Sequence, residues 1–167
     1  MKTIKVSEAQ GQALDWLVAK CQGHRFAVVY GRGAVRFKFG VWAQTSDGET
    51  QEYVMRFELD ALHKELDPDG PLRYQTTLVW EPTASWSQGG PIIEREGINV
   101  EYDGDWVYDP ANQAPDDEPD NGDRWLAAPW NNGTLGQYGP TPLIAAMRCY
   151  VASKLGETAE VPEELLA

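Results

Sequence analysis

Two adjacent glycines followed by a proline, Gly89, Gly90 and Pro91, mark the stretch of this sequence with the clearest binding chemistry. Proline suits the first position of a helix, because its ring fixes φ and no backbone donor is lost there. Free N–H groups at a helix start can hold an anion, and glycines let that anion come close. Trp86 and Arg95 could add stacking and positive charge. An ordinary helix start with turn residues is the alternative interpretation of the same pattern.

A second helix start of this kind is predicted at residues 139–142, with Thr141 as the N-cap and Pro142 at the first helical position. An aromatic residue precedes each start, Trp86 in one and Tyr138 in the other. If the fold brings the two together, they would form a phosphate site walled by rings, with charge from Arg95 or from a basic hairpin carrying Arg36 and Lys38. If it does not, the aromatic residues fill the core and the prolines merely start helices. The candidate ligand-binding residues are Trp86, Gln88, Gly89, Gly90, Glu94, Arg95, Tyr138 and Thr141.

Other site chemistry finds little support. The two His residues and two lone Cys residues match no structural zinc spacing, and we predict no metal site and no cofactor. Asp116, Asp117 and Asp120 could bind a divalent ion weakly, although a solvated charge run is the favoured interpretation. The motif Gly31-x-Gly33 leads into a strand pattern and not a helix, which argues against a dinucleotide-binding fold. No nucleophile motif is present, so catalysis is not expected, although Glu94 alone could act as a base.

Charge is distributed unevenly along the 167 residues, whose net charge is −12. Residues 101–123 hold nine acidic side chains and no basic ones, whereas residues 1–45 hold seven Lys or Arg against Glu8 and Asp15. The overall acidity argues against general nucleic-acid binding, while the basic N-terminal part allows a small anionic ligand. No apolar run is long enough to span a membrane, and no signal-peptide pattern is seen, so we expect a cytoplasmic protein with reduced Cys21 and Cys149.

Hydrophobic periodicity predicts a strand at residues 2–6 and a helix from Ser7, in a capping box with Gln10, to about residue 22. The other predictions, in chain order, are a hairpin with strands at 26–30 and 35–43, a strand at 52–59, a short helix at 60–66, a strand at 73–80, a helix starting at Pro91, a hairpin at 98–108 and a long helix from 142 to Gly156.

One domain covering residues 1–167 is expected at this length, with a mobile acidic loop at 109–123 and an acidic tail at 157–167. The turn lengths favour antiparallel strand pairing. Two main helices stand near the chain's ends. We therefore predict an α+β fold, a mostly antiparallel sheet with both helices packed on one face.

Three blocks of the sequence resemble the NinX-like proteins of tailed bacteriophages. They are MKTIKVSEA at 1–9 with ALDW at 13–16 and AKC at 19–21, WSQGGPIIEREGI at 86–98, and GPTPLIAAMRCYVASKLG at 139–156 with VPEEL at 161–165. Together they cover about half of the chain, and residues 24–80 depart from the usual, shorter pattern. The family's function is unknown, so the resemblance assigns no catalytic residue. It implies a phage accessory protein acting in the cytoplasm of an infected bacterium.

Three classes of function remain open. The favoured hypothesis is a protein that binds and sequesters a nucleotide-derived signal of host immunity without cleaving it, because the resembling blocks contain both helix starts. The second is an inhibitor of a host protein, in which the acidic residues 101–123 mimic nucleic acid. The third is an enzyme acting on a nucleotide. Exposed Trp residues would also suit a homo-oligomer.

Overall fold

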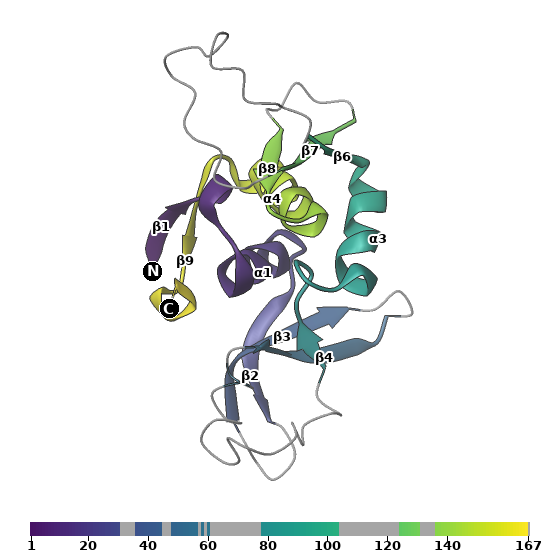
Figure 1. Cartoon of the computed structure of the whole chain (residues 1–167). Helices are drawn as coiled ribbons and strands as arrows, with labels where there is room; N and C mark the ends of the chain where they lie inside the picture. Colours follow the sequence, from purple (N-terminus) through teal and green to yellow (C-terminus); the bar gives the residue numbers. More distant parts are fainter. Residues whose placement is uncertain are drawn as a thin grey trace, which may run out of the picture.

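The computed structural model describes residues 1–30, 36–44, 48–56, 58, 60, 78–103, 124–130 and 136–166. Within them, nine strands form three separate sheets around a pair of central helices (Figure 1). The predicted α+β class with mostly antiparallel strands is confirmed, and the strands are divided among three sheets. Among the described residues, no helix is both long and apolar enough to cross a membrane.

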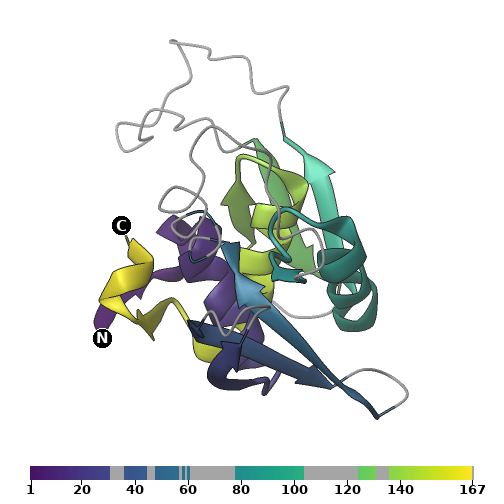
Figure 2. The same ribbon diagram turned by 90° about the horizontal axis from the view of Figure 1, so that it is seen from below.

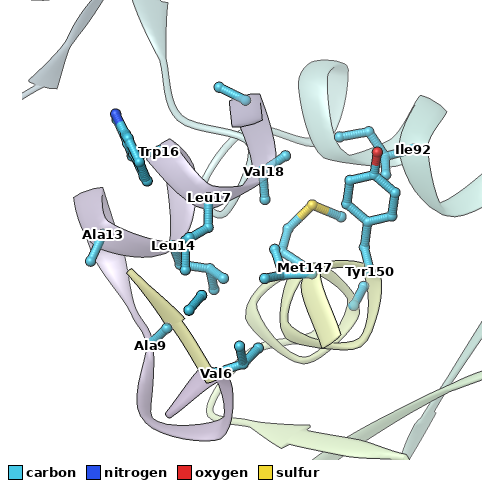
Figure 3. Close-up of a cluster of buried hydrophobic side chains, with 14 of the residues drawn as sticks. Val6, Ala9, Ala13, Leu14, Trp16, Leu17, Val18, Ile92, Met147 and Tyr150 are labelled. Carbon is cyan, nitrogen blue, oxygen red and sulfur yellow. The ribbon is translucent and has the colours of Figure 1, made fainter. Parts of the chain in front are cut away.

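The core is built on two helices, α1 (Gly11–Cys21) and α4 (Pro142–Leu155), which pack directly on each other. Residues 13–19 of α1 and 145–151 of α4 are all buried, so neither helix has a solvent-exposed face along these turns. A helix that is buried on every side must be covered by other elements on every side. Figure 3 shows Leu14 and Leu17 of α1 directed toward Met147 of α4.

Three sheets cover the sides of this helix pair. The sheet of β6 (Ile98–Tyr102), β7 (Trp125–Pro129) and β8 (Gln137–Gly139) lies on α4, with Ala127 fully buried. The first strand, β1 (Lys2–Lys5), pairs antiparallel with the last, β9 (Thr158–Val161), so the predicted acidic tail at 157–167 contains a sheet strand, followed by the 3-10 turn η3 (Glu163–Leu166).

The third sheet contains the predicted basic hairpin. Strands β2 (Arg25–Tyr30) and β3 (Arg36–Gln44) are antiparallel, as expected, and β4 (Thr50–Met55) continues the sheet. Strand β4 ends at Met55 and not at the predicted residue 59. The two-residue strand β5 (Val79–Trp80) joins β4 in parallel. The blue strands of this sheet extend beyond the helices (Figure 2).

The predicted start of the first helix was wrong. Residues Val6–Glu8 form a 3-10 turn, η1, and α1 begins at Gly11 with Gln10 as an N-cap that makes no side-chain bond. Val6 is buried, and its N–H donates to the carbonyl of Glu157 at 2.8 Å, which ties this segment to the C-terminal part of the chain. Gly11 has a φ of 51°, so the chain turns there before the helix proceeds.

The predicted helix start at Pro91 was also wrong. Helix α3 (Trp86–Glu96) begins five residues earlier, with Ser85 as its N-cap, so Pro91 lies inside the helix. A turn at residues 81–85 leads directly into the helix, and in it the N–H of Ser85 donates to the carbonyl of Glu81 at 2.8 Å. The predicted end is confirmed, because Gly97 caps α3 in the left-handed conformation with a φ of 61°.

Several predicted features lie outside the described residues. They are the turn at 31–33, most of the helix at 60–66 with His63, residues 73–77 of a predicted strand, residues 106–108 of the second hairpin, and the acidic loop at 109–123 with Asp116, Asp117 and Asp120. Strand β6 of that hairpin is present, and its partner in the described part of the chain is β7.

A buried arginine fastens α4 to two other segments. Arg148 is only 4% exposed; its Nε donates to the Ala9 carbonyl at 2.8 Å and its Nη1 to the Tyr138 carbonyl at 2.6 Å. A charged donor bonded to carbonyls inside a protein offsets much of the cost of burying it. Arg148 therefore fixes both the approach to α1 and strand β8 against α4.

A buried carboxylate similarly links α1 to the connection before α3. Asp15 is 5% exposed, its Oδ1 accepts a hydrogen bond from the N–H of Thr83 at 2.9 Å, and its carbonyl accepts one from Nε1 of Trp80 at 2.9 Å. Burial raises the pKa of Asp15 to about 7, although the hydrogen bonds from Thr83 oppose the rise. A raised pKa means that the charged form is disfavoured in the folded state.

We predict that the stability of the fold depends on pH through the Asp15 carboxyl group, and that Asp15→Asn removes this dependence. The variant keeps an oxygen acceptor for Thr83 and removes the charge. For the wild type, stability should fall as the pH rises from about 4, the unfolded pKa, to about 7, and stay level above. At about 1.4 kcal/mol per pKa unit, the variant should exceed the wild type by up to roughly 4 kcal/mol at pH 8 and by little at pH 4.

Urea unfolding at the two pH values measures this difference. Asp15→Ala is the matched control, because it leaves the Thr83 N–H without an acceptor and should be less stable than the Asn variant at both pH values. If Asp15→Asn exceeds the wild type in stability by the same amount at pH 4 and pH 8, the raised pKa assigned to Asp15 is wrong.

A second prediction compares the adjacent glycines of α3. A Cβ at Gly89 would lie 2.5 Å from the Pro82 carbonyl oxygen and 2.7 Å from Leu143 Cδ2, whereas one at Gly90 would meet only the Trp86 ring at 3.8 Å. Gly89→Ala should therefore destabilise the protein by about 1–3 kcal/mol through overpacking. Gly90→Ala should be neutral or stabilising by up to about 1 kcal/mol, because alanine favours a helix over glycine. Thermal unfolding of both variants tests the difference, and equal effects would argue against the close contact at Gly89.

Candidate functional site

The two glycines of the predicted anion site lie inside α3 and not ahead of it. The N–H of Gly89 donates to the Ser85 carbonyl at 2.8 Å, so it is engaged within the helix. Gly89 is buried against Pro82 and Leu143, the latter in the first turn of α4. The fold brings α3 and the start of α4 together through close packing at Gly89, which leaves no room there for a ligand.

Gln88 acts as a clamp on the segment before α3. Its Oε1 accepts from the N–H of Glu81 at 2.9 Å, and its Nε2 donates to the Val79 carbonyl at 2.7 Å. Both ends of the amide are therefore occupied by backbone groups. Gln88 joins strand β5 to helix α3.

The second predicted helix start is confirmed as a capped helix. Thr141 is the N-cap of α4 and its Oγ1 accepts from the N–H of Ile144 at 3.2 Å, with Pro142 at the first helical position. Tyr138, which precedes this helix start, is 45% exposed. Its hydroxyl group donates a hydrogen bond to Oδ2 of Asp103 at 2.8 Å, and this bond raises the pKa of Tyr138.

The remaining predicted residues are divided between open surface and a cleft. Trp86, the first residue of α3, is 59% exposed, and Glu94 is exposed as well. Arg95 lines a cleft of about 780 Å³ that sequence reasoning missed. Of the eight predicted ligand-binding residues, Arg95 is the one found in this cleft. Arg36 was a predicted source of charge, and its side chain lies outside the described set.

The cleft lies where the C-terminal ends of three helices meet the β2–β3–β4 sheet. Its lining comes from α1 and the turn that follows it, from β2, β3 and β4, and from the C-terminal halves of α3 and α4. The lining residues are Cys21, Gln22, Gly23, His24, Arg25, Trp42, Thr50, Arg95, Glu96, Tyr150 and Lys154.

The turns that end α1 and α3 position basic residues in the lining of the cleft. Gly23, with a φ of 72°, ends α1, and the N–H groups of Gly23 and His24 donate to the carbonyls of Lys20 and Ala19. Gly97 closes α3 in the same way, directly after Glu96. These bonds cap carbonyls that would otherwise present partial negative charge at the helix ends.

The lining is positively charged although the whole chain is strongly acidic. Arg25, Arg95 and Lys154 contribute three positive charges and Glu96 one negative charge, so the ionic side chains of the cleft sum to +2 with His24 neutral. The whole chain has a net charge of −12. The cleft is therefore a localised basic site in an acidic protein.

Each of the three cations is held in place by a neighbour. The guanidinium of Arg25 lies 5.5 Å from the ring centroid of Trp42, and Nζ of Lys154 lies 5.6 Å from that of Tyr150. Glu96 binds Arg95 Nε at 3.0 Å through Oε1 and Lys154 Nζ at 2.9 Å through Oε2. Cations positioned in advance lose less side-chain entropy when they bind an anion.

The remaining titratable groups of the cleft are close to neutral at pH 7. Burial raises the pKa of the Cys21 thiol to about 11, which keeps it protonated. Burial and the nearby Arg95 lower the pKa of His24, and its ring also contacts Trp80 edge-on at 5.1 Å. Burial raises the pKa of Tyr150. The cleft thus offers neutral rings and hydrogen-bonding groups beside its three cations.

A second hollow of about 520 Å³ has a different character. It lies between the start of α1, α4 and η3, and its lining includes Glu8, Gln10, Gln12, Ile144 and Leu165. With one carboxylate and no basic side chain, it does not suit an anion. In the described ranges, no group of three or more His, Cys, Asp or Glu residues is arranged to hold a metal ion.

The acidic segment that was proposed as a protein-binding surface is represented only by its first residues. Glu101 and Tyr102 belong to β6, and Asp103 follows it. Its other seven acidic residues lie outside the described part of the chain. An inhibitor function for residues 101–123 therefore stays a prediction.

A comparison with protein-family models places the chain among known proteins. A protein-family model described as Bacteriophage P22, NinX matches residues 5–154. The matched range includes residues 24–80 and the other stretches between the three blocks recognised in the sequence. A search of curated proteins finds no match.

Proposed function

This chain belongs to the bacteriophage P22 NinX family, and we propose that it is a phage accessory protein that binds a small nucleotide-derived ligand in the basic cleft. We further propose that it works in the cytoplasm of the infected bacterium, where it sequesters the ligand without converting it. A nucleotide that carries a signal of host immunity is the ligand class that suits such a role.

The charge contrast carries the proposal. The lining of the cleft sums to +2 whereas the whole chain carries −12, so attraction of an anion by the lining competes with repulsion by the net charge of the chain. A long nucleic acid would extend beyond the cleft and carry more negative charge than the lining balances, whereas a small anion needs only the cleft. The charge contrast therefore favours a small ligand over a polymer.

The size and lining of the cleft agree with a nucleotide. Its volume of about 780 Å³ lies within the range of roughly 300–1,000 Å³ typical of small-molecule sites. Trp42, Tyr150 and His24 provide ring surfaces, and Gln22 and Thr50 provide neutral polar groups. Phosphate would be bound by the cations, and a base or sugar by these neutral groups.

The protonated thiol of the cleft lining agrees with binding without conversion. Cys21 holds its proton at neutral pH, since its pKa is about 11, and a protonated thiol is a poor nucleophile. A protein that only holds its ligand needs affinity and no activated group. Pre-positioned cations provide such affinity.

Calorimetry with a panel of nucleosides, nucleotides and cyclic nucleotides tests the proposal. At least one phosphorylated member should bind, and the matching nucleoside should not. Lys154→Gln should weaken binding about tenfold, because losing one charged hydrogen bond costs roughly 1.5 kcal/mol. The bound compound should be recovered chemically unchanged after prolonged incubation.

Lys20→Gln is a matched control for this experiment. Lys20 also lies in the last turn of a helix and over an aromatic ring, 5.3 Å from the Trp16 centroid, but it does not line the cleft. Its substitution should leave binding unchanged. Binding by no panel member, or equal losses in the two lysine variants, would overturn the proposal, and a cleaved product would point to an enzyme instead.

A further inference from the structure

We infer that Glu96 determines the specificity of the cleft, by accepting hydrogen bonds from the ribose hydroxyls of the bound nucleotide. The ligand class is then a ribonucleotide, and the corresponding deoxyribonucleotide is disfavoured. This inference rests on the proposed function and specifies the ligand of the same site. It follows from the position of one carboxylate among the cations of the lining.

Glu96 is the only acidic residue among the described residues that line the cleft. A carboxylate repels a phosphate group at short range, so in an anion site it lowers the affinity unless the ligand also offers it a hydrogen-bond donor. The side chain of Glu96 is 22% exposed, so its ion pairs do not bury it completely. A ligand in the cleft therefore meets this carboxylate as well as the cations.

The protein leaves part of the acceptor capacity of Glu96 unused. Oε1 accepts a hydrogen bond from Nε of Arg95 at 3.0 Å, and Oε2 binds Nζ of Lys154 at 2.9 Å. Within the described residues, these two groups are its hydrogen-bond donors. An ionised carboxylate has about four acceptor sites, so about half of them are available to a ligand.

Glu96 is ionised at neutral pH and acts only as an acceptor. Burial by itself would raise the pKa of Glu96, but the hydrogen bonds from Lys154 and Arg95 lower it below its ordinary value. A hydrogen bond to an ionised acceptor is roughly twice as strong as one between neutral groups. The carboxylate therefore selects for a hydroxyl or N–H group of the ligand.

The neighbours of Glu96 indicate which donor of a nucleotide would reach it. Arg95 and Lys154 each contact one oxygen of the carboxylate, so a phosphate bound by either cation lies next to Glu96. In a nucleotide the sugar is bonded to the phosphate, whereas the base is attached to the far side of the sugar. Ribose carries a 2′-hydroxyl that deoxyribose lacks. A carboxylate recognises this hydroxyl of ribose in dinucleotide-binding folds, and the chemistry required here is the same.

Paired ribose and deoxyribose compounds test the inference by calorimetry. AMP, GMP and cyclic AMP are each compared with the analogue that lacks the 2′-hydroxyl. The wild-type protein should bind the ribose member of a pair about tenfold more tightly, because its partner lacks one hydrogen bond to a charged group. In Glu96→Gln this ratio should fall to about threefold, because a neutral amide oxygen accepts a weaker hydrogen bond.

The ratio separates recognition of ribose from positioning of the cations. Loss of the ion pairs of Glu96 would weaken both members of a pair equally and leave the ratio unchanged. Lys154→Gln should act in this way, with both affinities lower and the ratio near that of the wild type. Glu164→Gln is the matched control for charge, because Glu164 also forms an ion pair, with Lys38 at 2.8 Å, but does not line the cleft. It should change neither the affinities nor the ratio.

The outcomes separate this inference from the proposed function. If the compounds bind and the wild type does not distinguish ribose from deoxyribose, the cleft binds nucleotides but the inference is wrong, whatever the variants do. If Glu96→Gln, shown to be folded by circular dichroism, keeps the full wild-type ratio, another group recognises the ribose and the inference is also overturned. If no phosphorylated compound binds, the proposed function itself fails, and this inference fails with it.

Discussion

The burial of α1 and α4 against each other is the constraint on which the rest of the structure depends. Both helices are buried on all sides along their central turns. Such a pair cannot exist in water without cover, so three small sheets and α3 surround it (Figure 1). In the described ranges, the exposed residues of these two helices lie near their ends. The basic cleft forms at one of those ends, where capping turns and last-turn side chains reach solvent.

Local patterns predicted those elements whose signals are local. The hairpin of β2 and β3, the Thr141 cap of α4 and the left-handed Gly97 after α3 were all predicted, because turn residues and caps act within a few positions. The starts of α1 and α3 were missed for a tertiary reason. Val6 is held by Glu157, and the turn before α3 is held by Asp15, and both partners are more than 60 residues away in the chain.

The cleft was beyond prediction for a similar reason. Its charges come from Arg25, Arg95 and Lys154, which are far apart in sequence and meet only after three helices and a sheet have packed. Arg95 was among the predicted ligand-binding residues, but as a source of charge for the site predicted at the glycine pair. Those glycines illustrate the ambiguity of a single sequence, since bare backbone suits both an anion and a neighbouring helix. At Gly89 the neighbour is Leu143 of α4. The basic character of residues 1–45 was the one sequence signal that pointed toward the cleft.

The Gln88 clamp has a mechanical consequence for the cleft. The hydrogen bonds of its side-chain amide with Val79 and Glu81 link the sheet that carries Arg25 to helix α3, which carries Arg95. The sheet side and the helix side of the cleft are thus joined through one short bridge. The spacing between them therefore depends on an amide that does not itself line the cleft.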